Sequence, residues 1–255
     1  MPLRGRFVHI CPDLREFFGK SDYLIANLEG IISKARKKGL FSPSDQRQDK
    51  RIIGLLSGLF PPERTYLSVA NNHAEDYGEK AFLESIALLE SQNFRVFGWN
   101  ERPFFDINES IRIVSGTMWS NRTCEYIAKL KIAGEYTKPA AFNILYPHFG
   151  YEHELYPRPE IVTIGRKLIQ QFDAVLGHHS HCPQAVTIEP IGGTNRLLAY
   201  SLGNFIGAFR ARKYQSGIAL KLEVGQDQAK AWLVGKVEWR LIKCAPLPDG
   251  EFILS

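Results

Sequence analysis

The chain has few cysteines, and none of them stand close together. Its four, Cys11, Cys124, Cys182 and Cys244, include no Cys-x-x-Cys pair. This spacing gives no indication of a zinc knuckle or of a disulfide framework. Cys182 follows His181 directly, which makes it a candidate soft metal ligand, but we favour a buried structural thiol.

Long apolar segments are also missing. The first residues lack the apolar core of a signal peptide, and no stretch reaches the length of a membrane span. We therefore predict no transmembrane segment and a cytoplasmic location for the chain as it stands. An extracytoplasmic location would follow if the true N-terminus is missing.

Repeats, low-complexity segments and linkers are absent as well. With 255 residues, 44% of them hydrophobic and 23% charged, the composition is that of a soluble globular enzyme. The chain is long enough for one large domain or two small ones. We predict a single domain over residues 1–255 with its core at about 20–240.

Positive charge is concentrated near the N-terminus. The net charge is +5, and residues 1–60 hold 11 Lys and Arg against 6 Asp and Glu. The excess centres on the run from Lys34 to Lys38, which in most proteins would be a solvated loop. If this loop overhangs a site, Lys34 and Lys37 would favour an anionic substrate. No basic stripe interleaved with aromatic residues follows, so we predict no specific nucleic-acid partner.

Apolar runs of strand length alternate with helical patterns along the first part of the chain. Strands are predicted at 23–28, 66–70, 95–97, 111–115, 141–146 and 172–177. Helices are predicted at 46–56, 80–91 and 161–171. After Cys182 the pattern changes to strands without helices between them, at 185–188, 197–200, 217–224 and 231–239. The order predicts an α/β fold, with βα units first and a mostly antiparallel second sheet after them.

The most informative stretch runs from Val175 to Cys182. An apolar strand ends at Gly177, which we expect to free the backbone, and His178, His179 and His181 follow on the loop. Alternate loop residues can turn the same way, so His179 and His181 can face one point. Imidazole nitrogen is a common ligand of Zn, Mn and Fe, which makes this a candidate metal or phosphate site.

Polar residues follow three other predicted strands in the same way: Glu29, the pair Asn72 and His73, and His148. Each alone has a plain explanation, since Asn-His before a helix is an ordinary cap. Because the carboxyl ends of parallel strands share one edge of a sheet, we expect all of them to converge. The mixed oxygen and nitrogen set suits two divalent metals bridged by a carboxylate and water.

Five motifs in order also carry a family resemblance: Asn27-Leu-Glu-Gly30, Ala70-Asn-Asn-His-Ala-Glu-Asp-Tyr-Gly78, His148-Phe-Gly-Tyr-Glu152, Gly177-His-His-Ser-His181 and Tyr200-Ser-Leu-Gly-Asn-Phe205. They resemble the CapA family, a capsule or poly-γ-glutamate biosynthesis group within the calcineurin-like metallophosphoesterase superfamily. The resemblance covers roughly residues 20 to 210. It implies a four-layer αββα sandwich around a dinuclear metal centre.

The resemblance also implies roles for individual residues. Glu29 resembles the bridging carboxylate, and the other implied metal ligands are Asn72, His148, His179 and His181. His73 resembles the catalytic histidine. Glu152 is the second catalytic candidate, although a surface salt bridge explains it equally well. Asn27, His178 and Asn204 are candidates for supporting or substrate contacts, with Gly203 allowing a tight turn before Asn204. One or two ions of Mn, Fe or Zn are implied.

The chain departs from the family at its start. The superfamily opens with a strand that ends in Gly-Asp, whereas only 21 residues precede Asp22 here and none forms this pair. His9 and Asp13 are weak substitutes, and we interpret the usual first strand as absent. Ser180 also replaces the usual proline, a change of little consequence. We therefore expect one firmly bound metal and a second bound weakly or not at all.

Three functions remain open at this point. The one we favour is a metal-binding protein of capsule or poly-γ-glutamate biosynthesis that handles an anionic polymer and has weak phosphoester hydrolase chemistry. The alternatives are a competent dinuclear metallophosphoesterase acting on an unknown phosphoester, and a catalytically degenerate binding module.

Overall fold

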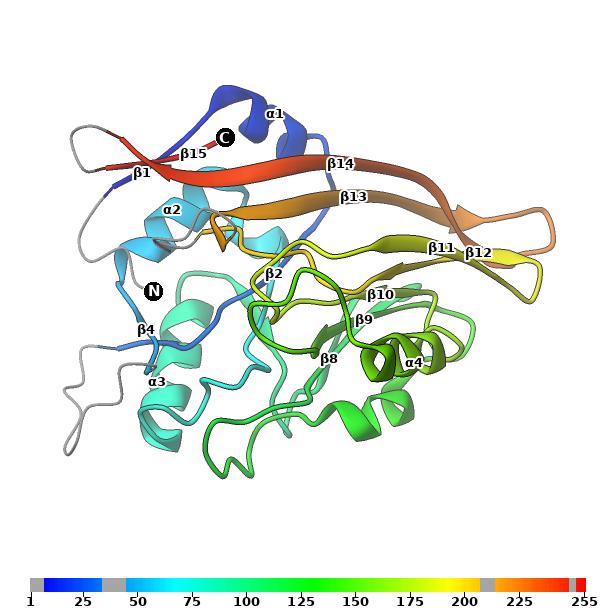
Figure 1. The fold of residues 1–255 in the computed structure, drawn as a ribbon, viewed down its shortest axis with the longest axis horizontal. Coiled ribbons are helices and arrows are strands. Elements are labelled where there is room, and N and C mark those ends of the chain that lie inside the picture. The colour runs from blue at the N-terminus through cyan, green and yellow to red at the C-terminus, as the bar shows by residue number, and fades with distance from the viewer. Residues whose placement is uncertain (1–6, 34–44, 207–213, 248–250) are drawn as a thin grey trace.

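The computed structural model describes residues 7–33, 45–206, 214–247 and 251–255 (Figure 1). The helices are α1 (Pro12–Gly19), α2 (Arg51–Leu59), α3 (Glu79–Glu90) and α4 (Pro159–Leu168), with 3-10 turns η1 (Pro62–Arg64) and η2 (Leu130–Tyr136). The strands are β1 (Val8–Ile10), β2 (Leu24–Asn27), β3 (Ile31–Ile32), β4 (Arg47–Gln48), β5 (Thr65–Ser68), β6 (Arg95–Phe97), β7 (Phe104–Asn108), β8 (Ile111–Thr117), β9 (Phe142–His148), β10 (Ala174–Leu176), β11 (Val186–Ile191), β12 (Thr194–Ala199), β13 (Ser216–Gln226), β14 (Trp232–Pro246) and β15 (Phe252–Leu254).

A six-stranded sheet occupies the middle of the chain, in the order β11-β12-β10-β9-β8-β7. Its four inner strands β12, β10, β9 and β8 are parallel, while β7 and β11 pair antiparallel at the edges. All seven residues of β9 and all three of β10 are buried. This explains why apolar residues follow one another in both strands, at residues 144–146 of β9 and 174–176 of β10, rather than alternating with polar ones.

A second, three-stranded parallel sheet has the order β2-β5-β6. It lies beside the first sheet, and the hydroxyls of Ser68 on β5 and Ser115 on β8 are hydrogen-bonded at 2.7 Å. The rings of Tyr66 and Phe105 also meet edge to face, with centroids 5.2 Å apart. The carboxyl ends of the strands in the two parallel sheets are therefore brought to the same region.

A third sheet, β1-β15-β14-β13, joins the two ends of the chain. Its long hairpin β13–β14 runs across the six-stranded sheet (Figure 1). Leu220 and Val234 of the hairpin share one apolar cluster with Ile144 and Leu197 of the six-stranded sheet. Two sheets thus face each other across this cluster. Burial of such side chains stabilises the fold by about 1.5–3 kcal/mol each.

Helices cover the remaining faces. α4 packs through Ile161 on the face of the six-stranded sheet that carries Val175. α1 packs on the third sheet, while α2 and α3 cover the sheet that contains β5 and β6. The protein is therefore a mixed α/β structure with several sheets. No helix in the described part of the chain is long and apolar enough to cross a membrane.

Several sequence predictions need correction. The helix expected at 46–56 begins only at Arg51, because residues 47–48 pair with β3 as a short parallel ladder. The strands predicted at 185–188 and 197–200 do not belong to a separate antiparallel sheet, since β12 pairs parallel with β10. On α3, Leu83 belongs to the apolar pattern that predicts the helix at 80–91, but its side chain is 46% exposed while Phe82, Ile86 and Leu89 are buried.

His9 and Asp13, the weak substitutes for the missing acidic residue, lie on β1 and α1. β1 pairs in parallel with β15, and the His9 ring contacts the Glu251 carboxylate. Asp13 lies in the first turn of α1, which covers the same sheet. His9 therefore belongs to the third sheet and Asp13 to its covering helix.

Candidate functional site

The predicted site residues follow the carboxyl ends of parallel strands in two sheets. They are Glu29 after β2, Asn72 and His73 after β5, His148 at the end of β9, His178, His179 and His181 after β10, and Asn204 after β12. Except for the part-exposed Glu29 and Asn204, all are buried. Local sequence explains this placement, because each residue stands directly behind an apolar run that forms an inner or adjoining strand.

Asn72 and His148 contact each other directly. Asn72 Nδ2 donates to Asn121 Oδ1 at 2.9 Å and to Glu152 Oε1 at 3.3 Å. The amide oxygen Oδ1 of Asn72 therefore accepts from His148 Nε2, 2.8 Å away. In this arrangement the two predicted ligands satisfy each other, and Glu152 is placed beside Asn72.

Glu29 faces two histidines. Its Oε1 atom is 3.6 Å from His181 Nε2 and 3.8 Å from His73 Nε2. Two donors on one zinc-like ion, with bonds of about 2.0–2.2 Å, stand about 3.0–3.5 Å apart. The carboxylate oxygen is therefore too far from each imidazole nitrogen for a formed site by only a few tenths of an ångström.

Hydrogen bonds at the opposite ring nitrogens orient both of these histidines. His73 Nδ1 lies 2.7 Å from Asp76 Oδ2, and His181 Nδ1 lies 2.8 Å from Asn204 Oδ1. Both oxygens are acceptors, so each ring carries its proton on Nδ1 and presents the lone pair of Nε2 toward Glu29. Such partners fix the tautomer of metal-binding histidines.

The remaining histidines, His148, His178 and His179, pack against one another beside this pair. The ring centroid of His179 lies 4.3 Å from that of His148 and 6.4 Å from that of His181. His178 stacks on Tyr146, with centroids 4.6 Å apart, and also meets His148 edge to face. His178 is thus a neighbour of the ring cluster that packs toward the core.

Burial keeps these rings neutral. Loss of solvent, together with the neighbouring histidines, lowers the pKa of His178 to about 3 and that of His179 to about 3. The same causes hold the pKa of His148 well below its usual value. A neutral imidazole retains the lone pair that a metal or a proton donor requires.

The cluster also contains buried polar atoms that lack a hydrogen-bond partner among the described residues: Glu29 Oε1, His148 Nδ1 and His179 Nδ1. Each such atom costs about 1–3 kcal/mol when it is left unpaired. Several of them in one place are characteristic of a binding site. The oxygen and nitrogen donors fit a divalent cation in type. However, no three His, Cys, Asp or Glu side chains in the described ranges are already arranged to hold an ion.

The backbone of the histidine loop is strained. His179 has a φ of 106° and His181 a φ of 58°, a region that residues other than glycine rarely adopt. Gly177 has a different role from the predicted one, because it provides space rather than backbone freedom. A Cβ atom there would lie 2.3 Å from both Phe149 Cε1 and the Tyr200 carbonyl oxygen. Gly203, with a φ of 69°, does form the expected turn.

Other predicted residues have plainer surroundings. Asn27 Oδ1 is 3.5 Å from Asn71 Nδ2, at the limit of a hydrogen bond. Cys182 is fully buried, as expected for a structural thiol. Lys34 and Lys37 lie outside the described residues.

Sequence reasoning missed three contributors. Asn71 holds the loop of Glu29, because it donates to the Leu28 carbonyl and accepts from the Gly30 amide. Asp76 orients His73, and their spacing of three residues was a readable signal. Asn121 has no comparable signal, since it comes from a distant loop.

Comparisons with known proteins give a consistent picture. The model of a family described as bacterial capsule synthesis protein PGA_cap matches residues 4–105 and 106–208. The chain is 24% identical over 231 residues to the capsule biosynthesis protein CapA of Bacillus anthracis, covering 78% of this chain and 53% of that protein. It is 22% identical over 219 residues to the PGA biosynthesis protein CapA of Bacillus subtilis (strain 168), covering 74% and 54%. The chain therefore spans about half the length of the curated relatives it matches.

A solved structure is similar over almost its whole length. It is the crystal structure of a hypothetical protein from Thermus thermophilus, with a TM-score of 0.53 and 16% identity. The match covers 93% of this chain and 97% of that one. At this identity the likeness concerns the fold alone, and it supports the mixed α/β architecture.

Proposed function

This chain belongs to the bacterial capsule synthesis protein family, within the metallophosphoesterase-like superfamily, and we propose that it acts on an anionic polymer or its precursor in capsule or poly-γ-glutamate biosynthesis. The names of the two Bacillus relatives support this role. The two facing sheets with helices outside are compatible with the four-layer αββα sandwich of the superfamily, which we propose as the full architecture.

The proposed site binds a divalent cation, Mn, Fe or Zn. The observation that carries this proposal is the pair of donors Glu29 Oε1 and His181 Nε2, which face each other at 3.6 Å, with the His181 ring oriented by Asn204. Only small movements separate these atoms from ligand spacing. His179 would be a further ligand, and the remaining ligands would be Asn72 and His148.

The two halves of the site differ in whether their ligand atoms are already engaged in hydrogen bonds. Glu29 Oε1 has no hydrogen-bond partner among the described residues, whereas Asn72 and His148 are engaged with each other at 2.8 Å. Binding at His148 Nε2 requires its proton to move to Nδ1, where no acceptor stands in the described part of the chain. We therefore expect one firmly bound ion and a weaker second one.

The metal would supply positive charge for an anionic oxygen and lower the pKa of a water molecule. The protein's own residues position the substrate and supply a proton. His73, with Nδ1–H held by Asp76, would have to carry a second proton on Nε2, which it would donate to the phosphoryl oxygen or leaving group. Glu152 lies next to Asn72 and would contact the substrate or orient that amide. With the second ion weakly held, phosphoester hydrolysis is expected to be slow.

Metal binding is tested by titration calorimetry of chelator-treated protein with Mn²⁺ and Zn²⁺. Wild type should bind about one ion, and His181→Ala should weaken binding by at least tenfold. The matched control is His9→Ala, which removes an exposed histidine of the third sheet. Unchanged binding by His181→Ala, or equal loss in both variants, would contradict the proposed site.

Turnover separates this function from its alternatives. With an aryl phosphate and Mn²⁺ we expect slow or undetectable hydrolysis together with binding of poly-γ-glutamate. Brisk turnover that is lost in His181→Ala would instead support a competent dinuclear phosphoesterase. Polymer binding without any metal binding would support a degenerate binding module.

A further inference from the structure

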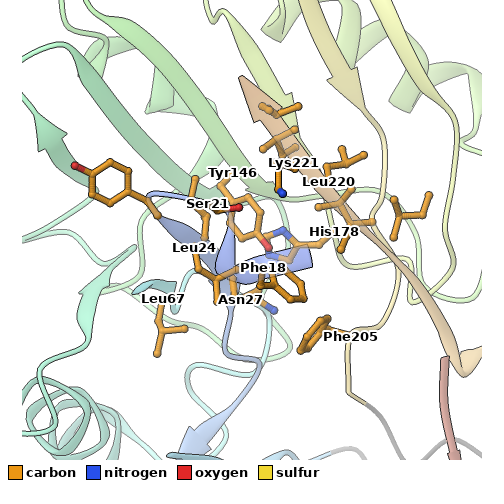
Figure 2. A pocket seen from close by; sticks show the side chains of 18 of the residues that line it. Phe18, Ser21, Leu24, Asn27, Leu67, Tyr146, His178, Phe205, Leu220 and Lys221 are labelled. Atoms are coloured by element: carbon orange, nitrogen blue, oxygen red, sulfur yellow. The ribbon is translucent and has the colours of Figure 1, made fainter. Parts of the chain in front are cut away.

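The histidine cluster has an apolar side and a polar side. On the apolar side, Tyr146 and His178 line a cavity of about 670 Å³ together with Leu24 of β2 and Leu220 of β13 (Figure 2). Asn72 is not among the residues that line this cavity. It lies on the polar side, where its side chain is in contact with Asn121 and Glu152. These two residues, rather than the cavity, determine the surroundings of the Asn72 amide.

Glu152 determines which way round the Asn72 amide lies. A carboxylate oxygen accepts hydrogen bonds and does not donate them. Because Glu152 Oε1 lies 3.3 Å from Asn72 Nδ2, the NH2 group of the amide must be on this side. The amide oxygen therefore lies at the other end, 2.8 Å from His148 Nε2. The atom of Asn72 that can bind a cation thus faces the histidine cluster.

Asn121 accepts the second proton of the same NH2 group. Its Oδ1 atom lies 2.9 Å from Asn72 Nδ2, so both N–H donors of the amide have an acceptor. The other end of the Asn121 amide lies against His73, with Nδ2 3.3 Å from the ring atom Nδ1. Since that ring atom donates its proton to Asp76, this second contact is packing and not a hydrogen bond. Asn121 therefore fills the space between Asn72 and His73.

The loop that carries Asn121 is attached to the segment that it supports. The Asn121 amide donates to the Asn72 carbonyl at 3.1 Å. The next residue, Arg122, donates from Nη1 to the Asp76 carbonyl at 2.9 Å and from Nη2 to the Asp45 carboxylate at 2.8 Å. Asn121 itself is exposed, so these bonds, and not burial, keep it in place.

The loop that carries Glu152 is attached to the histidine loop and to the loop of Asn121. One residue after Glu152, the His153 amide donates to the Ser180 carbonyl at 2.8 Å. Two residues before it, the Gly150 carbonyl accepts from the indole nitrogen of Trp119. Because Trp119 stands two residues before Asn121, the two acceptors of the Asn72 amide are held relative to each other.

We propose that Asn121 and Glu152 are positioning residues, which hold the Asn72 amide so that its oxygen, and not its NH2 group, faces the bound cation. This inference rests on the proposed metal site. If the amide turned over, its oxygen would face two acceptors and its NH2 group would face the cation, which it cannot bind. Either acceptor alone still distinguishes the two ends of the amide. Loss of both should therefore have a much larger effect than loss of one.

The first test measures the amide in the metal-free protein. Hydrogen exchange of the Asn72 side-chain NH2 group is read by ¹⁵N NMR, with the signals assigned by their loss in Asn72→Asp. In the double variant Asn121→Ala, Glu152→Ala we expect exchange to be faster than in wild type by about tenfold or more, with each single variant in between. The matched controls are Ser120→Ala and Glu154→Ala, whose side chains contact Arg122 and Arg158 instead, and both should leave this exchange unchanged.

The second test measures metal affinity by calorimetry with Mn²⁺ and Zn²⁺. The double variant should bind more weakly by about 10–100-fold, as is usual when the partners of a ligand are removed. Each single variant should stay close to wild type. Asn121→Asp combined with Glu152→Ala keeps one acceptor and should restore the affinity of the Glu152→Ala variant.

Two results would overturn the proposal. One is a double variant whose Asn72 exchange and metal affinity both match those of wild type. The other is a Glu152→Ala variant that no longer binds poly-γ-glutamate although the double variant leaves exchange and affinity unchanged, which would make Glu152 a substrate contact. A wild-type protein that binds no metal would contradict the proposed function instead. In that case the exchange measurement still decides whether Asn121 and Glu152 orient the amide, because it needs no metal.

Discussion

Replacing Gly177 with alanine should destabilise the protein strongly. The new methyl group would lie 2.3 Å from Phe149 Cε1 and 2.3 Å from the Tyr200 carbonyl oxygen, and 3.0 Å from the Ala199 carbonyl oxygen. Overpacking of this kind costs about 1–3 kcal/mol. Two of the three obstacles are backbone atoms at the end of β12, which cannot rotate away. We therefore expect the free energy of unfolding to fall by an amount near the upper end of this range, about 3 kcal/mol.

At about 2–4 °C for each kcal/mol in a domain of this size, the melting temperature should fall by about 6–12 °C. Urea denaturation and thermal melting followed by circular dichroism measure both quantities. The matched control is Gly54→Ala within α2, where no atom lies within 4 Å of the added Cβ. That variant should gain about 0.5–1 kcal/mol from helix propensity. If Gly177→Ala melts within about 1 °C of wild type, the packing argument is wrong.

Two further predictions address the site and the core. Asn204→Ala removes the acceptor for His181 Nδ1 and should weaken Mn²⁺ binding, measured by calorimetry, by about 10–100-fold. Asn204→Asp keeps the acceptor and should retain most of the Mn²⁺ affinity. Equal losses in both variants would refute the orienting role. Leu145→Ala, at a fully buried position of β9, should lower the free energy of unfolding by about 2–5 kcal/mol in urea titrations. Leu83→Ala, at an exposed position of α3, should change it by less than about 0.5 kcal/mol, and similar losses in the two would contradict the assigned burial.

The strand ends were the most predictable part of the structure. Apolar runs before Glu29, Asn72, His148 and His178 are local signals, and each of them forms a strand of a parallel sheet. Once the strands are parallel, their carboxyl ends must share an edge. The convergence of the polar residues therefore follows from short-range patterns and one rule of sheet geometry.

Long-range pairing was much less predictable. β1 pairs with β15 across more than 240 residues, and nothing in the short run Val8–Ile10 specifies that partner. The same holds for β12, whose apolar pattern fits either an antiparallel hairpin with β11 or the parallel pairing with β10 that it also makes. Such choices depend on which buried surface is available in the assembled fold, so local sequence leaves them open.

The supporting contacts of the site also include some that local sequence predicts and some that only the assembled fold determines. Asp76 stands three residues after His73, so its hydrogen bond could be inferred from spacing in a turn. Asn121 reaches Asn72 from a loop 49 residues away, and no local pattern indicates it. Gly177 illustrates a third case. The residue was noticed, but the close approach of Phe149 that requires it appears only in three dimensions.

The position of Glu29 depends on the least supported strand of the site. The histidine loop follows β10, which is fully buried between two neighbours and can sustain strained backbone at His179 and His181. Glu29 instead follows β2, whose residues are only partly buried and whose outer edge borders the cavity. Side chains hold the loop, Asn71 at Leu28 and Gly30 and Gln48 at the Glu29 carbonyl, 2.7 Å away. The distances of 3.6 and 3.8 Å from Glu29 to its two histidines are therefore the ones most easily changed by a movement of β2. Because Glu29 stands directly after this strand, a contact that holds β2 in place also holds the carboxylate at metal-ligand spacing.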